Sequence, residues 1–520
     1  MTADKSSERY LVAVRSAIDN EAWDEATSIL RLNWTEMVAS HLEDFRSVLL
    51  AFPMSVVEAD PLLRAAREMF IGHGTSGRFT SGLSTDPNDL AEMARRPDVI
   101  ETLAIGTVQA SLLRFAGDMA SGADFAERLE QAALVAGSVQ PDVVAAALPV
   151  LRLQWAITCQ LAGRRRGANT VFQRAYSGAE AVGLGFVARN SAGSLALNCA
   201  LAGQLGDARE WIGKWEATQP SEGRLEKMIR VTGLVAKALI SLENLDVDSA
   251  AADLDVLIDE LRDRDEMWAY ILFARCQCFL LSGEPQRGID LIDRFAPTFN
   301  RWRTPDSEAG SLLTSVEVDL LCALGRGNVA QMVLRRHSGE HPLLSVARAR
   351  LALLTGDPET ALAEATRVST GGSLDLRARV DGLLIAAVAC LQVGRPDDAI
   401  ATWRRATALA ESVGTVRPLA MVPPGALNVL TEAGATLPHR WNEYAHATQV
   451  LPDTVPVVAL SDRELVVLSA LAEGLSGAET AAKLFVSQNT VKTQVQSLFR
   501  KLAVHNKTDA VRAAMALRLL

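Results

Sequence analysis

The side chains best suited to specific chemistry lie near the C-terminus, on one face of an expected helix that ends at Leu502. The face repeats every four residues and consists of Gln488, Lys492, Gln496 and Arg500, with Asn489 and Thr493 beside it. Amide, hydroxyl and cationic groups are the kinds of group that hydrogen-bond to base edges and phosphates in the major groove of DNA. A helix face that only meets solvent usually mixes Glu among its cations, and this face has no carboxylate. It therefore predicts contact with double-stranded DNA.

Four short helices are expected to position this face. Two begin with capping boxes, in which a Ser and a Glu three residues later bond to each other's backbone N–H groups; these are Ser461 with Glu464 and Ser476 with Glu479. Gly474 ends the first helix, Ser487 caps the third, and the fourth runs from about Thr508 to Arg518. The third has an apolar stripe for packing, made of Val491, Val495, Leu498, Phe499 and Leu502. This order predicts a helix-turn-helix module.

The charge of this segment differs from that of the rest of the chain. The net charge of −10 by itself argues against nucleic-acid binding. Residues 460–520, however, contain eight basic and five acidic side chains, a net of +3, which leaves −13 for the rest. Four of the chain's eight lysines lie there, at Lys483, Lys492, Lys501 and Lys507. The asymmetry indicates a basic module on an acidic body, with a basic solvated tail as the alternative.

Residues 457–520 resemble the DNA-binding domain of LuxR-type regulators. The resemblance rests on LSDRE, GLS, SQNTVKT, KLAV and KTDAV. It implies a four-helix module whose third helix enters the major groove and whose fourth helix often forms a dimer. Carried across by position, the resemblance implies that Lys492, Thr493 and Gln496 face the bases, and the polar helix face adds Gln488 and Asn489 to this predicted set. The resemblance implies contacts to the DNA backbone from Ser487, Thr490, Arg500 and Lys501, and we also predict one from Lys507.

Three positions depart from the family pattern. Gln494 stands where the family usually has His, so the local DNA contact is expected to differ. Thr480 replaces the usual Ile of the second helix, which should weaken packing. Asn506-Lys507 replaces the commoner pair that ends in Arg, which keeps the charge but loses a bidentate donor.

A repeat with a Gly-type helix breaker organises the rest of the chain. The breaker lies five residues before a small residue and recurs at spacings of 31 to 42 residues, at Gly163, Gly203, Leu245, Gly283, Gly325, Gly356 and Gly394. Glu21 marks a similar first copy, and SGADFAE around Gly122 a degraded one. A left-handed breaker followed by a second helix predicts a helical hairpin. Stacked hairpins predict an all-α fold, with an α-solenoid that resembles the longer tetratricopeptide-type repeats.

The repeat region also has a wider resemblance. Residues 20–68 and 411–430 are similar to the first and last solenoid repeats of MalT-like regulators, in which an ATPase module precedes a solenoid and a LuxR-type domain. No P-loop motif is present, so the chain is expected to lack that ATPase module. The expected domains are a sensor or partner-binding solenoid over 1–450, a linker over 451–456 and the helix-turn-helix domain over 457–520.

Several other classes are not expected. The glycine-rich stretch 72–89 follows no apolar strand and predicts a loop rather than a nucleotide site. His337 and His341 lie in an expected loop, which does not favour a metal site. The six cysteines follow the repeat and are expected to pack in the core. We therefore expect no metal, no cofactor and no enzymatic activity. No uncharged apolar run of about eighteen residues is present, so we expect no membrane-spanning helix.

The sequence thus predicts a cytoplasmic transcriptional regulator that binds DNA as a homodimer. RNA polymerase is a further candidate partner. The signal on the solenoid remains open among a peptide, a small molecule and a protein. The alternative is a solenoid adaptor whose terminal helices bind protein rather than DNA.

Overall fold

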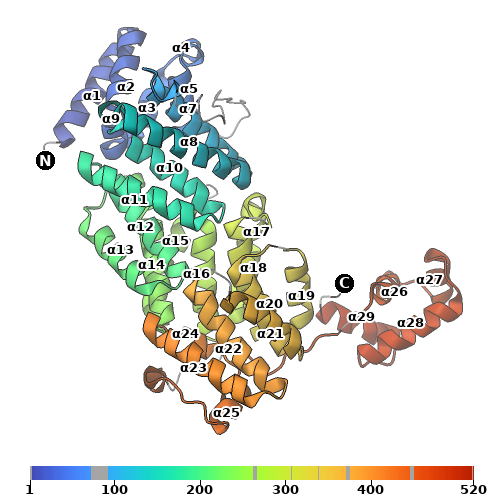
Figure 1. The fold of residues 1–520 in the computed structure, drawn as a ribbon. Helices are drawn as coiled ribbons and strands as arrows, with labels where there is room; N and C mark the ends of the chain where they lie inside the picture. The colour runs from blue at the N-terminus through green and yellow to red at the C-terminus, as the bar shows by residue number, and fades with distance from the viewer. Residues whose placement is uncertain are drawn as a thin grey trace. The chain divides into compact units, whose positions relative to one another are not determined.

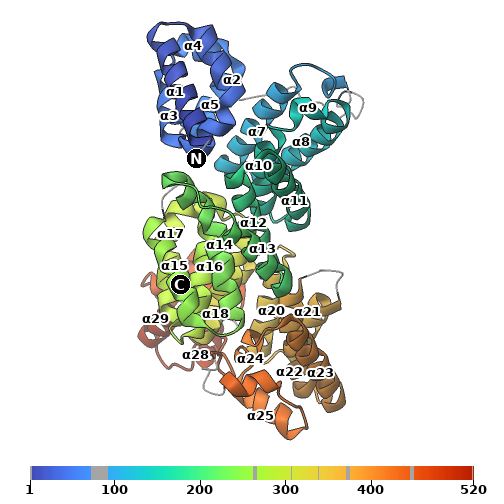
Figure 2. The ribbon, with the colours of Figure 1, turned by 90° about the vertical axis from the view of Figure 1, so that its left-hand side faces the viewer.

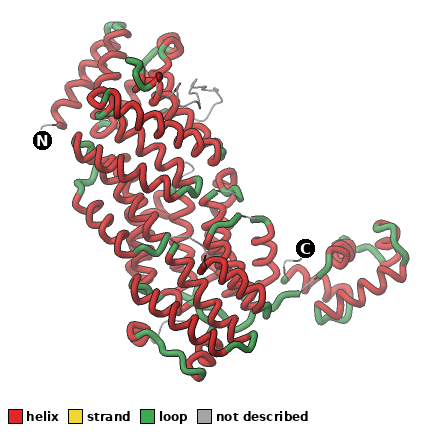
Figure 3. Tube along the Cα trace, in the orientation of Figure 1, coloured by secondary structure: helices red, strands yellow, loops and turns green. Residues whose placement is uncertain are grey.

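A computed structural model describes residues 3–71, 89, 92–261, 266–305, 307–337, 339–370, 375–444, 450–458, 460–517 and 519. Throughout this described part the chain forms helices joined by loops, and no strand occurs in it (Figure 3). The all-α fold class expected from the sequence is confirmed. The predicted loop over 72–89 lies outside the described residues except for Asp89.

The chain divides into two compact units. The first comprises Met1–Ala274, Phe295–Leu312 and Asp375–Arg377, and the second comprises Arg275–Arg294, Leu313–Leu374 and Ala378–Leu520. This division falls within the region predicted as one solenoid. The solenoid and its boundaries at residues 450 and 457 stay predictions.

The first unit is built from sequential helices that pack on their neighbours. Its helices are α1 (Ala3–Asp19), α2 (Trp23–Ser40), α3 (Leu42–Ala51), α4 (Met54–Ala59), α5 (Pro61–Phe70), α7 (Val99–Ala116), α8 (Met119–Val139), α9 (Pro141–Val144), α10 (Leu148–Leu161), α11 (Arg165–Val182), α12 (Gly185–Leu201), α13 (Leu205–Ala217), α14 (Gly223–Glu243) and α15 (Val247–Glu260). Helix α12 packs against α11, α13 and α14, and α10 packs against α8 and α11 (Figures 1 and 2). Contacts with both the adjacent helix and the next but one are those of stacked hairpins.

Four helices contain a boundary between the two units, and one 3₁₀ turn lies in the part of the first unit between two of these boundaries. They are α16 (Trp268–Leu281), α17 (Pro285–Phe299), η1 (Asn300–Trp302), α18 (Glu308–Ala323) and α22 (Leu376–Gln392). The second unit adds α19 (Gly327–Arg335), α20 (Pro342–Leu354), α21 (Pro358–Thr370), α23 (Pro396–Val413), α24 (Arg417–Ala420), α25 (Pro424–Glu432) and η2 (His439–Tyr444). It ends with α26 (Asp462–Ala472), α27 (Gly477–Lys483), α28 (Gln488–Lys501) and α29 (Lys507–Ala516).

The predicted breakers adopt the left-handed conformation. Their φ angles lie between 69° and 79° at the six glycines, Gly163, Gly203, Gly283, Gly325, Gly356 and Gly394. Leu245 and Glu21 have φ of 59° and 55°, although a side chain disfavours this region. The breaker register is therefore confirmed even where glycine is absent.

The small residue after each breaker is also where the pattern places it. Each alanine five residues on is completely buried, at Ala26, Ala168, Ala208, Ala250, Ala330, Ala361 and Ala399. One copy needs correction, because Gly122 is not a breaker. Gly117 has the positive φ, of 90°, and Gly122 takes the small-residue position, where a Cβ atom would lie 3.3 Å from the carbonyl oxygen of Ala110. The sequence did not distinguish the breaker from the small residue here, because glycine occupies both position 117 and position 122.

The cysteines and the paired histidines occupy the structural positions expected of them. All six cysteines are buried and unbridged. Burial raises the pKa of the Cys159 and Cys199 thiols to about 12, so both stay protonated and unreactive near neutral pH. His337 lies in a loop, and Nδ1 of His341 accepts the backbone N–H of Leu343, 3.2 Å away, at the start of α20.

Within the described residues, α7 is long and apolar enough, by length and composition, to cross a bilayer. The helix includes the charged residues Glu101 and Arg114, so it contains no uncharged apolar run of eighteen residues. It packs against α8 and α10, and the buried Arg114 donates to the hydroxyl of Thr158 at 2.7 Å and the carbonyl of Gln154 at 3.2 Å. These are the contacts of a packed helix of the first unit.

The segment before α26 is packed onto the second unit. The backbone N–H of Val455 donates to the carbonyl of Leu354 at 2.7 Å, and that of Val458 donates to the Asn328 side chain at 2.9 Å. Gly327 permits this approach, because a Cβ atom there would lie 2.6 Å from Cγ2 of Val457. The predicted linker is thus fixed to α19 and α20 by specific contacts.

We predict that Gly203→Ala destabilises the first unit more than Gly183→Ala. Both residues have positive φ, which costs an alanine about 1 kcal/mol. Gly183 has open space around it, whereas a Cβ at Gly203 would lie 2.5 Å from the backbone nitrogen of Arg377. Urea unfolding followed by tryptophan fluorescence should show a loss of about 1 kcal/mol for Gly183→Ala and at least about 2 kcal/mol for Gly203→Ala. Equal losses would contradict the tight approach.

Candidate nucleic-acid interface

The caps predicted for the C-terminal helices are present. Ser461 with Glu464 and Ser476 with Glu479 form complete capping boxes at the starts of α26 and α27. The Ser487 hydroxyl accepts the backbone N–H of Thr490 at 3.1 Å and caps α28. Asn506 caps α29, which begins at Lys507 and ends at Ala516, within two residues of the expected limits. Local sequence signals therefore define all four helices.

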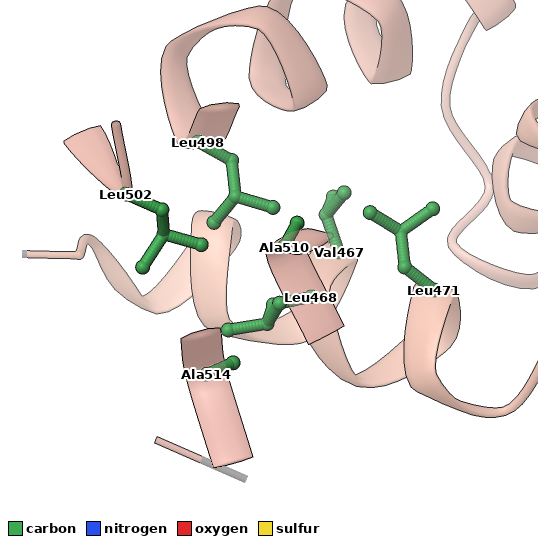
Figure 4. Packing of buried hydrophobic residues seen from close by; sticks show 7 residues of the cluster. All are labelled: Val467, Leu468, Leu471, Leu498, Leu502, Ala510 and Ala514. Atoms are coloured by element: carbon green, nitrogen blue, oxygen red, sulfur yellow. The ribbon is translucent and has the colours of Figure 1, made fainter. Parts of the chain in front are cut away.

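One apolar core holds these helices together. Its buried members are Val467, Leu468, Leu471, Leu498, Leu502, Ala510 and Ala514. Figure 4 shows these side chains pointing toward one another from α26, α28 and α29. The predicted stripe of α28 takes part as expected, since Val491 is buried and Val495 and Phe499 pack against the cluster. This packing fixes which face of α28 remains outside.

The predicted base-facing residues all lie on the exposed side of α28. They are Gln488, Asn489, Lys492, Thr493 and Gln496. No ion pair within the described part of the chain involves Lys492 or Arg500. Both cations are therefore available to an external partner, although the role of each residue toward DNA stays a prediction.

The predicted backbone contacts fall into two groups. Ser487, Thr490 and Arg500 are exposed at the two ends of α28. The ammonium groups of Lys501 and Lys507 have partners inside the module: Lys501 lies 2.7 Å from a Glu464 oxygen, and Lys507 donates to the carbonyl of Leu475 at 2.8 Å. These two lysines therefore stabilise the module, whatever they contribute to DNA binding.

The Glu464 carboxylate joins α26 to α28. It is buried, at 3% exposure, and accepts bonds from the Ser461 backbone at 2.7 Å, the Ser497 hydroxyl at 2.8 Å and the Lys501 ammonium at 2.7 Å. Burial by itself would raise its pKa, but the hydrogen bonds, led by that from Lys501, outweigh burial and lower the pKa to about 2. The carboxylate is thus ionised at neutral pH and determines how α28 is held.

Three residues near α28 differ in how well the sequence predicts their environment: Phe485 was not predicted, whereas Thr480 and Gln494 were expected to differ from the family pattern. Phe485, in the turn before α28, is 96% exposed and has φ of 54°; no periodicity signal marks it, because the residue lies between helices. Thr480 is completely buried and its hydroxyl makes no hydrogen bond to any described residue, which gives the expected weaker packing a specific physical cause. Gln494 is half-buried beside the exposed face.

Comparison with known proteins agrees with this geometry. Residues 458–514 match the sequence model of the family described as bacterial regulatory proteins, luxR family. The C-terminal part of the chain is therefore a LuxR-type helix-turn-helix domain, and the resemblance seen in the sequence is confirmed there. The similarity to MalT-like solenoids stays a prediction.

Individual relatives match over the same C-terminal region. A nitrate/nitrite response regulator protein homolog of Haemophilus influenzae is 47% identical over 55 residues, 11% of this chain and 26% of that protein. The CsgBAC operon transcriptional regulatory protein of Escherichia coli is 50% identical over 52 residues, 10% and 24% of the two chains. A probable transcriptional regulatory protein NarL of Mycobacterium tuberculosis is 44% identical over 75 residues, 14% and 35%. The match thus spans about a quarter to a third of each relative.

We predict that Glu464→Gln destabilises the four-helix module by about 2 kcal/mol at pH 7, since it removes the charge that Lys501, Ser461 and Ser497 surround. Hydrogen exchange of the α26–α29 amides measures this loss. Because the folded pKa lies below the usual 4.5, the stabilisation is complete above pH 4.5 and is lost as the pH falls through about 2. The difference between the two proteins should therefore shrink on acidification.

The matched control is Glu473→Gln. Glu473 also pairs with a lysine, Lys483, but both side chains are about half exposed. Exposed pairs contribute little, so this variant should change amide protection by less than about 0.5 kcal/mol. Equal effects of the two substitutions would show that burial of Glu464 is not what matters.

Proposed function

We propose that the chain is a sequence-specific DNA-binding transcriptional regulator whose α28 binds in the major groove. The observation that carries this proposal is the exposed, carboxylate-free face of α28 within a domain that matches the luxR family. Its amide, hydroxyl and ammonium groups suit base edges. The names of the matched relatives, which describe transcriptional regulators, support the same class of function.

The exposed groups suggest a division of labour. Lys492 lies in the middle of the face, where an ammonium group suits the acceptors of guanine. Ser487 and Thr490 lie at the N-terminus of α28, whose free N–H groups favour a phosphate. Arg500, at the other end, suits a second phosphate. Lys501 and Lys507 add positive charge while they hold the module in shape.

The remainder of the chain is proposed to sense a signal. Stacked helical hairpins present extended surfaces for ligands or partner proteins. In this proposal the regulator acts in the cytoplasm, carries out no catalysis, and transmits its signal to the C-terminal domain and from there to RNA polymerase. The acidic charge of the rest of the chain, −13, would oppose non-specific DNA binding by that part.

An alternative is an adaptor whose terminal helices bind protein. The exposed Phe485 and its neighbour Val486, which is 43% exposed, favour this alternative because they form an apolar turn beside α28. Binding of the full chain to duplex DNA distinguishes the two functions. A DNA-binding regulator should bind duplex DNA in a salt-dependent way, whereas an adaptor that binds protein through Phe485 should not.

The decisive substitution is Lys492→Ala. The full chain first selects its DNA site from random duplexes. On that site we expect Lys492→Ala to weaken binding by about 1–3 kcal/mol and to reduce base specificity at one position. Arg500→Ala should weaken binding to all duplexes alike. Arg209→Ala is the control and should bind like the unaltered chain, because Arg209 is exposed on α13 of the first unit. Gel shifts in which Lys492→Ala binds like the unaltered chain would refute the role of α28.

We also expect the selected site to be an inverted repeat bound by a homodimer. One module offers too few contacts for genomic specificity, and half-sites one helical turn apart match a two-fold dimer. With three or four phosphate contacts per module, log K should fall against log salt with a slope of roughly −5 to −7. Scrambling one half-site should reduce the slope by about half. An unchanged slope would mean that a single module accounts for binding.

A further inference from the structure

A cavity of about 650 Å³ lies within the first unit. Side chains of α2, α3, α5, α7, α10, α12, α14 and α15 line it, all from residues 27–267, so no residue of α26–α29 contributes. Pockets of 300 to 1,000 Å³ are the usual size for a small organic ligand. The cavity is therefore large enough for a ligand well beyond the size of a few water molecules.

Most of the lining is apolar and rich in rings. Its aromatic members are Trp34, Phe45, Phe70, Phe115 and Phe186. Aliphatic side chains such as Leu30, Val108 and Ile157 fill the spaces between them. Such a wall favours an apolar ligand body, which leaves water when it enters.

The charged side chains that line the cavity are mostly cationic. Among the described residues they are Arg31, Arg46, Arg114, Arg224 and Lys227, against one carboxylate, Glu266. Arg114 already pairs with Glu266, its Nε lying 2.5 Å from Oε1, so this buried pair is neutral as a whole. The described lining therefore carries a net positive charge.

Three of these arginines are partly exposed to solvent and pair with carboxylates outside the described lining. Arg31, Arg46 and Arg224 have side-chain exposures of 45%, 29% and 55%. Arg31 pairs with Asp60 at 3.0 Å and Glu101 at 4.0 Å, and Arg46 and Arg224 pair with Glu43 at 3.6 and 3.7 Å. The pairs with Glu43, which is 62% exposed, are weak, so an incoming anion can exchange with them.

Two buried hydroxyls in the lining add a polar requirement. Ser111 and Thr232 are each 2% exposed, and their hydroxyl oxygens make no hydrogen bond within the described part of the protein. A buried hydroxyl without a partner costs stability. A ligand with an oxygen acceptor or a hydroxyl of its own would remove that cost.

We propose that this cavity binds a small amphipathic anion, with a ring or medium-length chain among the aromatic side chains and a carboxylate or similar head at the arginines. This ligand is the signal of the sensing part of the proposed function, on which the inference rests. It does not depend on how α28 binds DNA. A cationic ligand fits the same space less well, because the described lining has a net positive charge.

The test uses the full chain and the fluorescent probe 8-anilinonaphthalene-1-sulfonate, which joins aromatic rings to a sulfonate. Decanoate should displace the probe at a concentration at least about tenfold lower than decylammonium, which has the same chain and the opposite charge. Equal displacement by the two would overturn the anionic assignment, as would displacement by a hydrophobic cationic peptide but not by decanoate.

Substitutions locate the site. Ala104 lines the cavity on α7, so Ala104→Trp should fill it and weaken probe binding at least about tenfold. Leu134→Trp is the control, because Leu134 is 42% exposed on α8 and does not line the cavity. If Ala104→Trp misfolds, the doubly substituted Arg31→Gln, Arg224→Gln chain, altered only at exposed positions, should weaken decanoate binding at least about threefold. Unchanged binding in the folded variants would overturn the proposal.

The two proposals fail separately. Lys492→Ala should bind the probe and decanoate like the unaltered chain, since Lys492 lies on α28. Loss of DNA binding with intact decanoate binding would overturn only the DNA assignment. Intact DNA binding in a chain that binds neither probe nor decanoate would overturn only the cavity assignment.

Discussion

The C-terminal domain depends on one buried ionised group, the Glu464 carboxylate. It closes the first turn of α26, receives the Ser497 hydroxyl and the Lys501 ammonium from α28, and has its charge balanced by the latter. Because a buried carboxylate is costly unless its oxygens are bonded, α28 has little freedom to rotate about its axis. The apolar stripe of α28 favours the same orientation, so the core and the ion pair together keep Lys492 outside.

Local signals in the sequence predicted much of this arrangement. Capping boxes and left-handed breakers depend on residues within five positions of each other, so they survive whatever the distant chain does. This is why the starts of α26, α27 and α28 and even the non-glycine breaker Leu245 were found. The exposed row on α28 follows from helical periodicity alone, once the apolar stripe identifies the packed side.

Features that need distant contacts were not predicted. The sequence shows that Lys501 and Lys507 are basic, but not that Glu464 and the Leu475 carbonyl hold them. Gly117 and Gly122 could not be told apart, because the roles of breaker and spacer differ in backbone angle rather than residue type. The cavity is lined by side chains of eight helices, and the periodicity of a single helix cannot predict a space that several helices enclose.

The anchored segment before α26 limits how far the DNA-binding domain can move. The last described contact of that segment is between Val458 and Asn328, and α26 is capped by Ser461, three residues later. Three residues span at most about 11 Å. While that contact lasts, the domain searches only a small volume around α19, far less than a long flexible linker would allow. In the proposed homodimer, the second units that carry the two domains would determine the distance between them, and with it the separation of half-sites that one dimer can bridge.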